Sequence, residues 1–160
     1  MPYVVQKKDI QMKIPLKFTN YDDVFERLIM EEEEALDIYN ALIGKCQTHE
    51  LRRIFFQFVQ EETKHIEDLK RIREKYPGED FSSPVKVVVE RDLGNWENLE
   101  SLAYIEVLKF AKEEERKTMK LYQNIADQVK DKEVEQLFLK IAEEERIHYQ
   151  RTKEMYNSEK

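Results

Sequence analysis

The sequence is short of the residues that interrupt helices and of the residue that cross-links chains. Its 160 residues include only three glycines, four prolines and one cysteine. A single cysteine, Cys46, excludes an internal disulfide and is compatible with a reducing cytoplasm, where we expect the protein to reside. The scarcity of glycine and proline leaves little room for loops, so the chain is expected to be mostly helical.

Long apolar runs are missing as well. No stretch of about 18 or more apolar residues occurs, so no membrane span is expected, and no apolar segment typical of a secretory signal peptide follows Met1. The formal net charge is −7 and there is no basic stripe, which argues against nucleic acid as a partner. With 41% hydrophobic and 38% charged residues, the composition is that of one soluble domain of amphipathic helices.

The most informative feature present is an internal duplication at an offset of 83 positions. The segment EEEEALDIY at 31–39 becomes EERKTMKLY at 114–122, and EETKH at 61–65 becomes EERIH at 144–148. Each copy therefore reads E-x6-Y-x22-E-x2-H. The pattern consists of Glu32, Tyr39, Glu62 and His65 in the first copy and Glu115, Tyr122, Glu145 and His148 in the second. We interpret each copy as a two-helix hairpin, and the two hairpins together as an all-α four-helix bundle.

One glutamate of each acidic run falls at a position that helical periodicity assigns to the core. Glu32 lies in the middle of an apolar stripe whose members recur every three or four residues, whereas Glu31, Glu33 and Glu34 point away from its centre. Similar stripes are interrupted by Glu115 and by the members of both E-x2-H pairs, Glu62, His65, Glu145 and His148. A run of glutamates is ordinarily a solvated helix face. These positions indicate burial instead.

Buried carboxylates need compensation, because an isolated charge in an apolar interior costs on the order of tens of kcal/mol. Two divalent cations would cancel four carboxylate charges, and two neutral imidazoles would complete the ligand set. Residues i and i+3 lie about 60° apart on one helix face, so the Glu and His of each E-x2-H pair can approach one ion. The sequence therefore predicts a carboxylate-bridged dimetal site. Imidazole and carboxylate ligands alone leave iron, manganese and zinc open.

The domain boundaries follow from the duplication and from capping residues. Helices are expected from about Tyr21 to Ile43 with Thr19 or Asn20 as the cap, and from the residue after Thr48 to the residue before Tyr76. Two more are expected from near Asn95 or Asn98 to about Val129, and from the residue after Asp131 to about Tyr156. The bundle would span 19–158, with repeats at about 20–75 and 95–156 joined by a long crossover at 76–94.

An extended arm is expected before the bundle, at 1–18. The arm alternates apolar residues from Ile10 to Phe18, and the crossover contains the valine-rich stretch 85–89. These segments could pair as strands, within one chain or across a dimer, or the arm could simply pack on the bundle.

The combined E-x6-Y and E-x2-H pattern resembles the rubrerythrin branch of the ferritin-like diiron proteins, over roughly residues 20–156. The resemblance implies two iron ions per chain, with Glu62 and Glu145 as the bridging ligands. The full implied ligand set is Glu32, Glu62, His65, Glu115, Glu145 and His148. Tyr39 and Tyr122 would donate hydrogen bonds to ligand carboxylates; the alternative is that they are ordinary core tyrosines.

The resemblance implies a redox protein, and the sequence departs from the family pattern at three points. One cysteine cannot supply the C-x-x-C pairs of a rubredoxin module, so electrons would come from a separate, rubredoxin-type protein. Thr118 replaces a carboxylate that rubrerythrins tend to have, and Thr63 replaces the haem-binding Met of bacterioferritins.

The expected function is reduction of hydrogen peroxide or dioxygen by a homodimer. Iron oxidation for storage and hydroxylation of an organic substrate are the alternatives.

Overall fold

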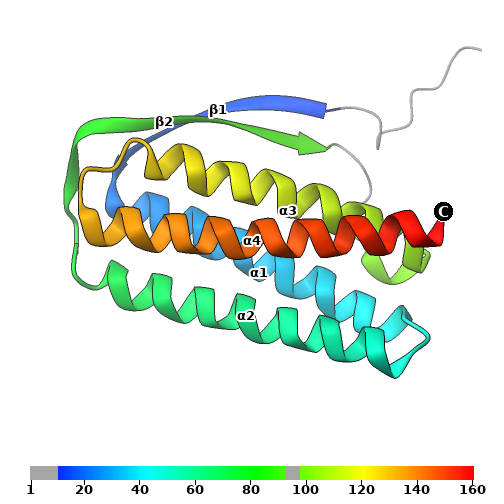
Figure 1. The fold of residues 1–160 in the computed structure, drawn as a ribbon. Helices are drawn as coiled ribbons and strands as arrows, with labels where there is room; N and C mark the ends of the chain where they lie inside the picture. The colour runs from blue at the N-terminus through cyan, green and yellow to red at the C-terminus, as the bar shows by residue number, and fades with distance from the viewer. Residues whose placement is uncertain (1–10, 93–97) are drawn as a thin grey trace, which may run out of the picture.

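Four long helices and a two-stranded ribbon make up the computed structural model, which describes residues 11–92 and 98–160 (Figure 1). The elements in chain order are β1 (Gln11–Asn20), α1 (Tyr21–Lys45), α2 (His49–Arg73), β2 (Asp80–Asp92), the 3-10 helix η2 (Leu99–Ser101), α3 (Tyr104–Ala126) and α4 (Lys132–Glu159). Helices α1 and α2 form one antiparallel hairpin and α3 and α4 form the other. The predicted four-helix bundle of two hairpins with a long crossover is confirmed.

Short polar side chains fix where three of the helices begin. The side chains of Asn20, Thr48 and Asp131 accept hydrogen bonds from backbone N–H groups three residues later, at 2.9, 3.1 and 3.0 Å. Each bond satisfies one of the N–H groups that a helix leaves without a partner at its first turn. Thr48 and Asp131 are 83 positions apart, so the second helix of each repeat begins at the same place.

The crossover returns along the bundle as strand β2, so that α2 and α3 run in the same direction (Figure 1). Strand β2 pairs antiparallel with β1 of the same chain, and α3 packs beneath it. Ile14 is opposite Val89, Leu16 opposite Val87, and Phe18 opposite Val85. Of the two pairings that the sequence allowed, the one within a single chain is therefore correct.

Side chains alternate between the two faces of the ribbon, and one of these faces packs on the core. Val85 and Val87 are 1% and 5% exposed, whereas Val88 between Val87 and Val89 is 58% exposed. Residues 1–10 of the predicted arm and 93–94 of the predicted crossover lie outside the described residues.

Helix α3 begins later than the sequence predicted. A start at Asn98 is wrong, because residues 99–101 form a 3-10 turn and Leu102 and Ala103 are extended. The carboxylate of Glu106 accepts a hydrogen bond from the backbone N–H of Ala103 at 3.3 Å, which caps the helix from inside its first turn. The other suggested start, Asn95, lies outside the described residues.

Two apolar clusters occupy the bundle, one on each side of a polar layer. The first includes Phe25, Tyr122 and Phe138 with the inward face of the ribbon. The second lies toward the turn that joins α1 to α2, and it includes Tyr39 and Phe58. Across the described ranges, none of the helices combines the length and the apolar character that crossing a lipid bilayer requires.

Candidate metal centre

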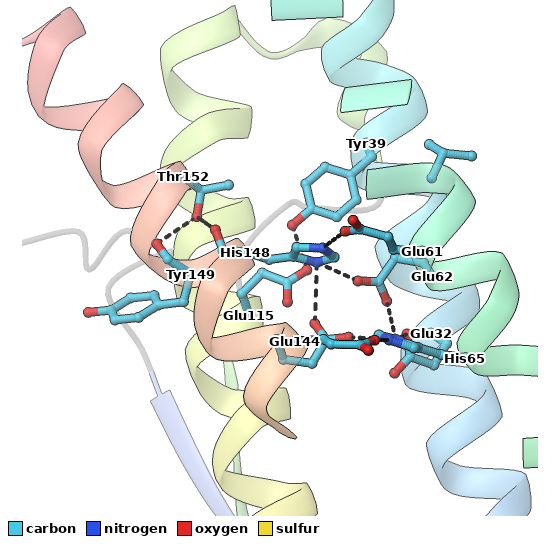
Figure 2. A network of polar contacts seen from close by, with 12 residues as sticks. Glu32, Tyr39, Glu61, Glu62, His65, Glu115, Glu144, His148, Tyr149 and Thr152 are labelled. Carbon is cyan, nitrogen blue, oxygen red and sulfur yellow. Dashed lines mark hydrogen bonds and ion pairs between the residues drawn. The ribbon is translucent and has the colours of Figure 1, made fainter. Parts of the chain in front are cut away.

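The structure brings the six predicted ligand residues together in the polar layer between the apolar clusters (Figure 2). Helices α1 and α3 contribute one glutamate each, whereas α2 and α4 each contribute a glutamate and a histidine one helical turn apart. None of the six is more than 3% exposed: Glu32, Glu62, His65, Glu115, Glu145 and His148. The burial inferred from helical periodicity is therefore confirmed for every one of these positions.

The six side chains form two overlapping groups of four. One group is Glu32, Glu62, His65 and Glu145, and the other is Glu62, Glu115, Glu145 and His148. Within each group, one ligand atom per residue lies within 4.8 Å of the others. Glu62 and Glu145 belong to both groups. Two cations held in these groups would therefore share these two carboxylates and have one glutamate and one histidine each to themselves.

The atoms that face the centre have few hydrogen bonds despite their burial. Both carboxylate oxygens of Glu62 and of Glu145, Oε2 of Glu115 and Nδ1 of His148 have no hydrogen-bond partner. His148 Nδ1 lies 2.7 Å from Glu62 Oε1, but the two atoms do not have the alignment of a hydrogen bond. Buried polar atoms are rarely left in this way. Lone pairs that converge without donors fit cations, and the set of carboxylates and imidazoles fits a carboxylate-bridged pair of metal ions.

Two tyrosines each link the two hairpins through a ligand residue of the other hairpin. The hydroxyl of Tyr39 on α1 donates a hydrogen bond to Glu115 on α3, at 2.6 Å. Tyr122 on α3 donates to Glu32 on α1, at 2.7 Å. Each bond uses Oε1 of its acceptor, so the second oxygen of each carboxylate can face the centre. The predicted contacts of both tyrosines are therefore present.

Two further glutamates, which the sequence analysis did not single out, orient the histidine rings. Glu144 on α4 accepts a short contact from His65 Nε2, and Glu61 on α2 does the same for His148 Nε2 (Figure 2). With Nε2 held outside, Nδ1 of each ring faces the centre, since His65 Nδ1 is 3.0 Å from Glu145 Oε1. The duplication could have revealed this pair, because Glu61 and Glu144 are also 83 positions apart.

Crowding of the carboxylates changes their acidity in the metal-free protein. Burial, followed by repulsion from Glu32 and Glu62, raises the pKa of Glu145 to about 8. Burial and neighbouring carboxylates also hold the pKa of Glu62 and of Glu115 well above the usual range. The pKa of Glu32 is lowered: burial opposes ionisation, but its close contacts with Glu62, His65 and Tyr122 outweigh burial. The metal-free centre therefore holds protons where the metal-bound centre would hold cations.

The pKa values of the two histidines are raised as well. Burial disfavours the imidazolium of His148, but its contact with Glu61 and the charges of Glu115 and Glu145 outweigh burial and raise the pKa. His65 is raised in the same way, against burial, by contacts with Glu144 and the central glutamates. In the metal-free protein, protonated imidazoles thus supply part of the positive charge that the carboxylates require.

The fold and this centre define a ferritin-like bundle with a buried cluster of carboxylates and histidines, compatible with a diiron site. The rubrerythrin family model matches residues 23–156, and the chain belongs to the rubrerythrin family. A search of curated proteins finds no match.

Three solved structures share this fold. A candidate ferritin-like diiron-carboxylate protein from Thermotoga maritima superposes with a TM-score of 0.69 at 21% identity, over 89% of this chain and 98% of that one. A hypothetical protein from Pyrococcus furiosus gives 0.67 at 21% identity, over 86% and 88%. A protein from Anabaena variabilis with DJ-1/ThiJ/PfpI-like and ferritin-like domains gives 0.63 at 16% identity, over 89% of this chain and 38% of that one.

Proposed function

We propose that this protein is a non-haem diiron redox protein that reduces hydrogen peroxide or dioxygen. The observation that carries the proposal is the pair of buried ligand groups that share Glu62 and Glu145, whose oxygens have no hydrogen-bond donors. Two iron ions per chain would be held there by Glu32, Glu62, His65, Glu115, Glu145 and His148. Manganese or zinc in the same ligands would bind without giving the same redox chemistry.

When bound, two ferrous ions would supply one electron each, which with two protons reduces one hydrogen peroxide to two waters. The chain's own residues set the conditions for that reaction. The apolar clusters on both sides exclude bulk water. Tyr39 and Tyr122 hold Glu115 and Glu32 in place, and Glu61 and Glu144 hold the two imidazoles.

A separate electron donor, such as a rubredoxin-type protein, would restore the reduced state. We propose this donor because rubrerythrin-like chemistry is expected to need one and Cys46, which is buried, is the only cysteine of the chain. A homodimer and a cytoplasmic location remain predictions of the sequence.

Metal analysis and rapid kinetics test the proposal. After anaerobic iron loading, metal content should approach two ions per chain, and a plateau at one or none would contradict the dimetal assignment. The reduced, iron-loaded protein should then be mixed with hydrogen peroxide and, separately, with dioxygen at equal concentration. We expect peroxide to react faster.

Two other results would point to the alternative functions. Faster reaction with dioxygen, together with accumulation of iron beyond two ions per chain, would favour storage. Dioxygen consumption only when an organic substrate is present would favour hydroxylation. The variant Glu115→Ala should abolish whichever reaction occurs, because it removes a ligand and leaves positive charge uncompensated.

A further inference from the structure

A second group of carboxylates lies beside the candidate metal centre, where α1 packs against α3. Glu31, Glu34 and Glu114 each offer an oxygen within 4.8 Å of the others. The side chains of Glu31 and Glu114 are only 11% and 23% exposed, so these two are not the freely solvated groups that an acidic run suggests. Glu31 and Glu114 occupy equivalent places in the two repeats, 83 positions apart.

A small cavity connects these carboxylates with the centre. It has a volume of about 10 Å³ and is lined by Glu31, Glu34 and Glu114 together with Glu115 and Tyr39. That volume is close to the minimum that admits one water molecule, and an ion of similar size needs no more. Glu115 is 3% exposed, and its Oε2 has no hydrogen-bond partner. Glu115, a predicted ligand with one unpartnered oxygen, thus borders the same space as the three outer carboxylates.

Small side chains keep this space open. Ala35, Ala111 and Thr118 line the cavity, and Ala111 is the counterpart of Leu28 in the first repeat. Thr118 stands where a further carboxylate was expected from the family pattern, and it is short enough to leave room. A larger apolar residue at any of these positions would fill a volume of this size.

Outside the three carboxylates, a wider depression opens toward the ribbon. It has a volume of about 140 Å³ and is also lined by Glu31, Glu34 and Glu114, with Val88 and Glu90 from β2. The outer carboxylates therefore lie between a solvent-connected hollow and the cavity at Glu115. This arrangement gives a continuous series of oxygen ligands from the surface to the centre.

We propose that Glu31, Glu34 and Glu114 form the site through which divalent cations pass to the dimetal centre, an inference that rests on the proposed function. The geometry supports passage rather than storage, because basic groups already occupy the carboxylates. Arg27 Nε is 2.8 Å from Glu31, and Lys117 Nζ is 3.3 Å from Glu114. A cation must displace these groups, which keeps binding weak enough for release inward. Oxygen ligands without imidazole suit a divalent ion in transit.

The test compares the rate of metal uptake with the amount of metal finally bound. The double variant Glu31→Gln/Glu114→Gln keeps the size of both side chains and removes two charges. Glu133→Gln/Glu143→Gln, on the exposed surface of α4, makes the same charge change elsewhere. Uptake of ferrous ion under anaerobic conditions should be measured by stopped flow at several salt concentrations. Uptake of cobalt(II) should be measured in the same way, with the visible absorption of the bound ion as the signal.

We expect uptake in the first variant to be roughly tenfold slower and less dependent on salt, with unchanged final metal content. The control variant should behave as wild type. In the opposite direction, Lys117→Met should speed uptake. If the first variant does not fold, Glu34→Gln serves in its place, with a smaller slowing in the same direction.

Other outcomes separate this inference from the proposed function. Equal uptake rates with full metal content in the variant would overturn the passage and leave the diiron centre intact. A lower final content would also overturn it, because the carboxylates would then be holding metal at equilibrium. Failure of the wild-type chain to bind either metal would remove the proposed function, and the passage with it.

Discussion

At the scale of single residues, the centre depends on carboxylates placed where only a cation or a proton can satisfy them. Glu62 and Glu145 are fully buried and present four oxygens without hydrogen-bond donors. Glu32 and Glu115 each have one oxygen fixed by a tyrosine. This difference separates the two shared carboxylates from the two that would serve one ion each.

The shared position of Glu62 predicts a difference between two ligand variants. Glu62→Ala should lower the affinity for both ions, whereas Glu32→Ala should mainly affect the ion held with His65, because Glu32 belongs to only one of the two ligand groups. Metal content after dialysis against a graded series of chelator concentrations measures this. Equal loss of both ions from the two variants would show that Glu62 is not a bridge.

Glu61 and Glu144, which contact the two histidines, predict a weaker effect on metal affinity. Glu144→Gln and Glu61→Gln should each lower metal affinity by about 10- to 100-fold, because an imidazole without its carboxylate partner loses both orientation and basicity. Competition with a coloured chelator gives the affinity. Glu143→Gln, next to Glu144 but paired with Arg146 at the surface, is the matched control and should bind metal normally.

The tyrosines contribute to stability as well as to geometry. Tyr122→Phe should reduce the free energy of unfolding by about 1–3 kcal/mol, because the buried carboxylate of Glu32 loses a hydrogen-bond donor. Tyr39→Phe should act similarly through Glu115. Urea unfolding of the metal-free proteins measures the loss. Values near zero for both would mean that these hydrogen bonds are not net stabilising.

At the scale of secondary-structure elements, the ribbon covers the bundle without providing a ligand. Phe18 on β1 is 7% exposed and belongs to the apolar cluster that also contains Val85 and Val87. The ribbon therefore contributes to the core beside the centre and not to the ligand groups themselves. Its role should be separable from metal binding.

That separation can be measured with two substitutions in the ribbon. Phe18→Ala should lower the free energy of unfolding by about 3–5 kcal/mol through the cavity it leaves, with little change in metal content at saturation. Val88→Ala, on the exposed face, should change stability by less than about 0.5 kcal/mol. Thermal melts and metal analysis of both variants check this. Loss of metal from folded Phe18→Ala would show that the ribbon also positions the ligands.

At the scale of the whole molecule, protons and metal ions compete for one buried cluster. The folded-state pKa of Glu145 is raised from 4.5 to about 8, and the pKa values of Glu62, Glu115 and both histidines are raised as well. Between pH 4.5 and about 8, the unfolded chain releases protons that the folded metal-free chain retains. Its free energy of unfolding should therefore fall as pH rises from about 4.5 to 8.

Metal binding should reverse this trend, because ligands must be deprotonated to bind and the cations then replace the protons. We expect the melting temperature of the metal-free protein to fall by at least several degrees across this range. The difference between metal-bound and metal-free melting temperatures should widen over the same interval. Calorimetry of both forms at five or six pH values is the measurement, and parallel curves would mean that the glutamates titrate as if solvated.

The sequence was sufficient to predict four helices in two hairpins and the burial of the six central residues, although α3 begins later than predicted. Helical periodicity is a local property, so Glu32 among apolar neighbours could be assigned to the core, and the offset of 83 positions supplied its counterpart Glu115. The caps Thr48 and Asp131 could be read in the same way. These predictions succeed because they depend on the order of residues along one helix.

Which residues of different helices meet follows from how the helices pack. Glu61 and Glu144 hold histidines on opposite hairpins, and Glu31 and Glu114 meet across the contact between α1 and α3. Each belongs to an acidic run whose default prediction is a solvated face, and only the packing of one helix against another decides which members are buried. The pairing of β1 with β2 is of the same kind: alternation showed that both segments could be strands, and the three-dimensional return of the chain selected the partner.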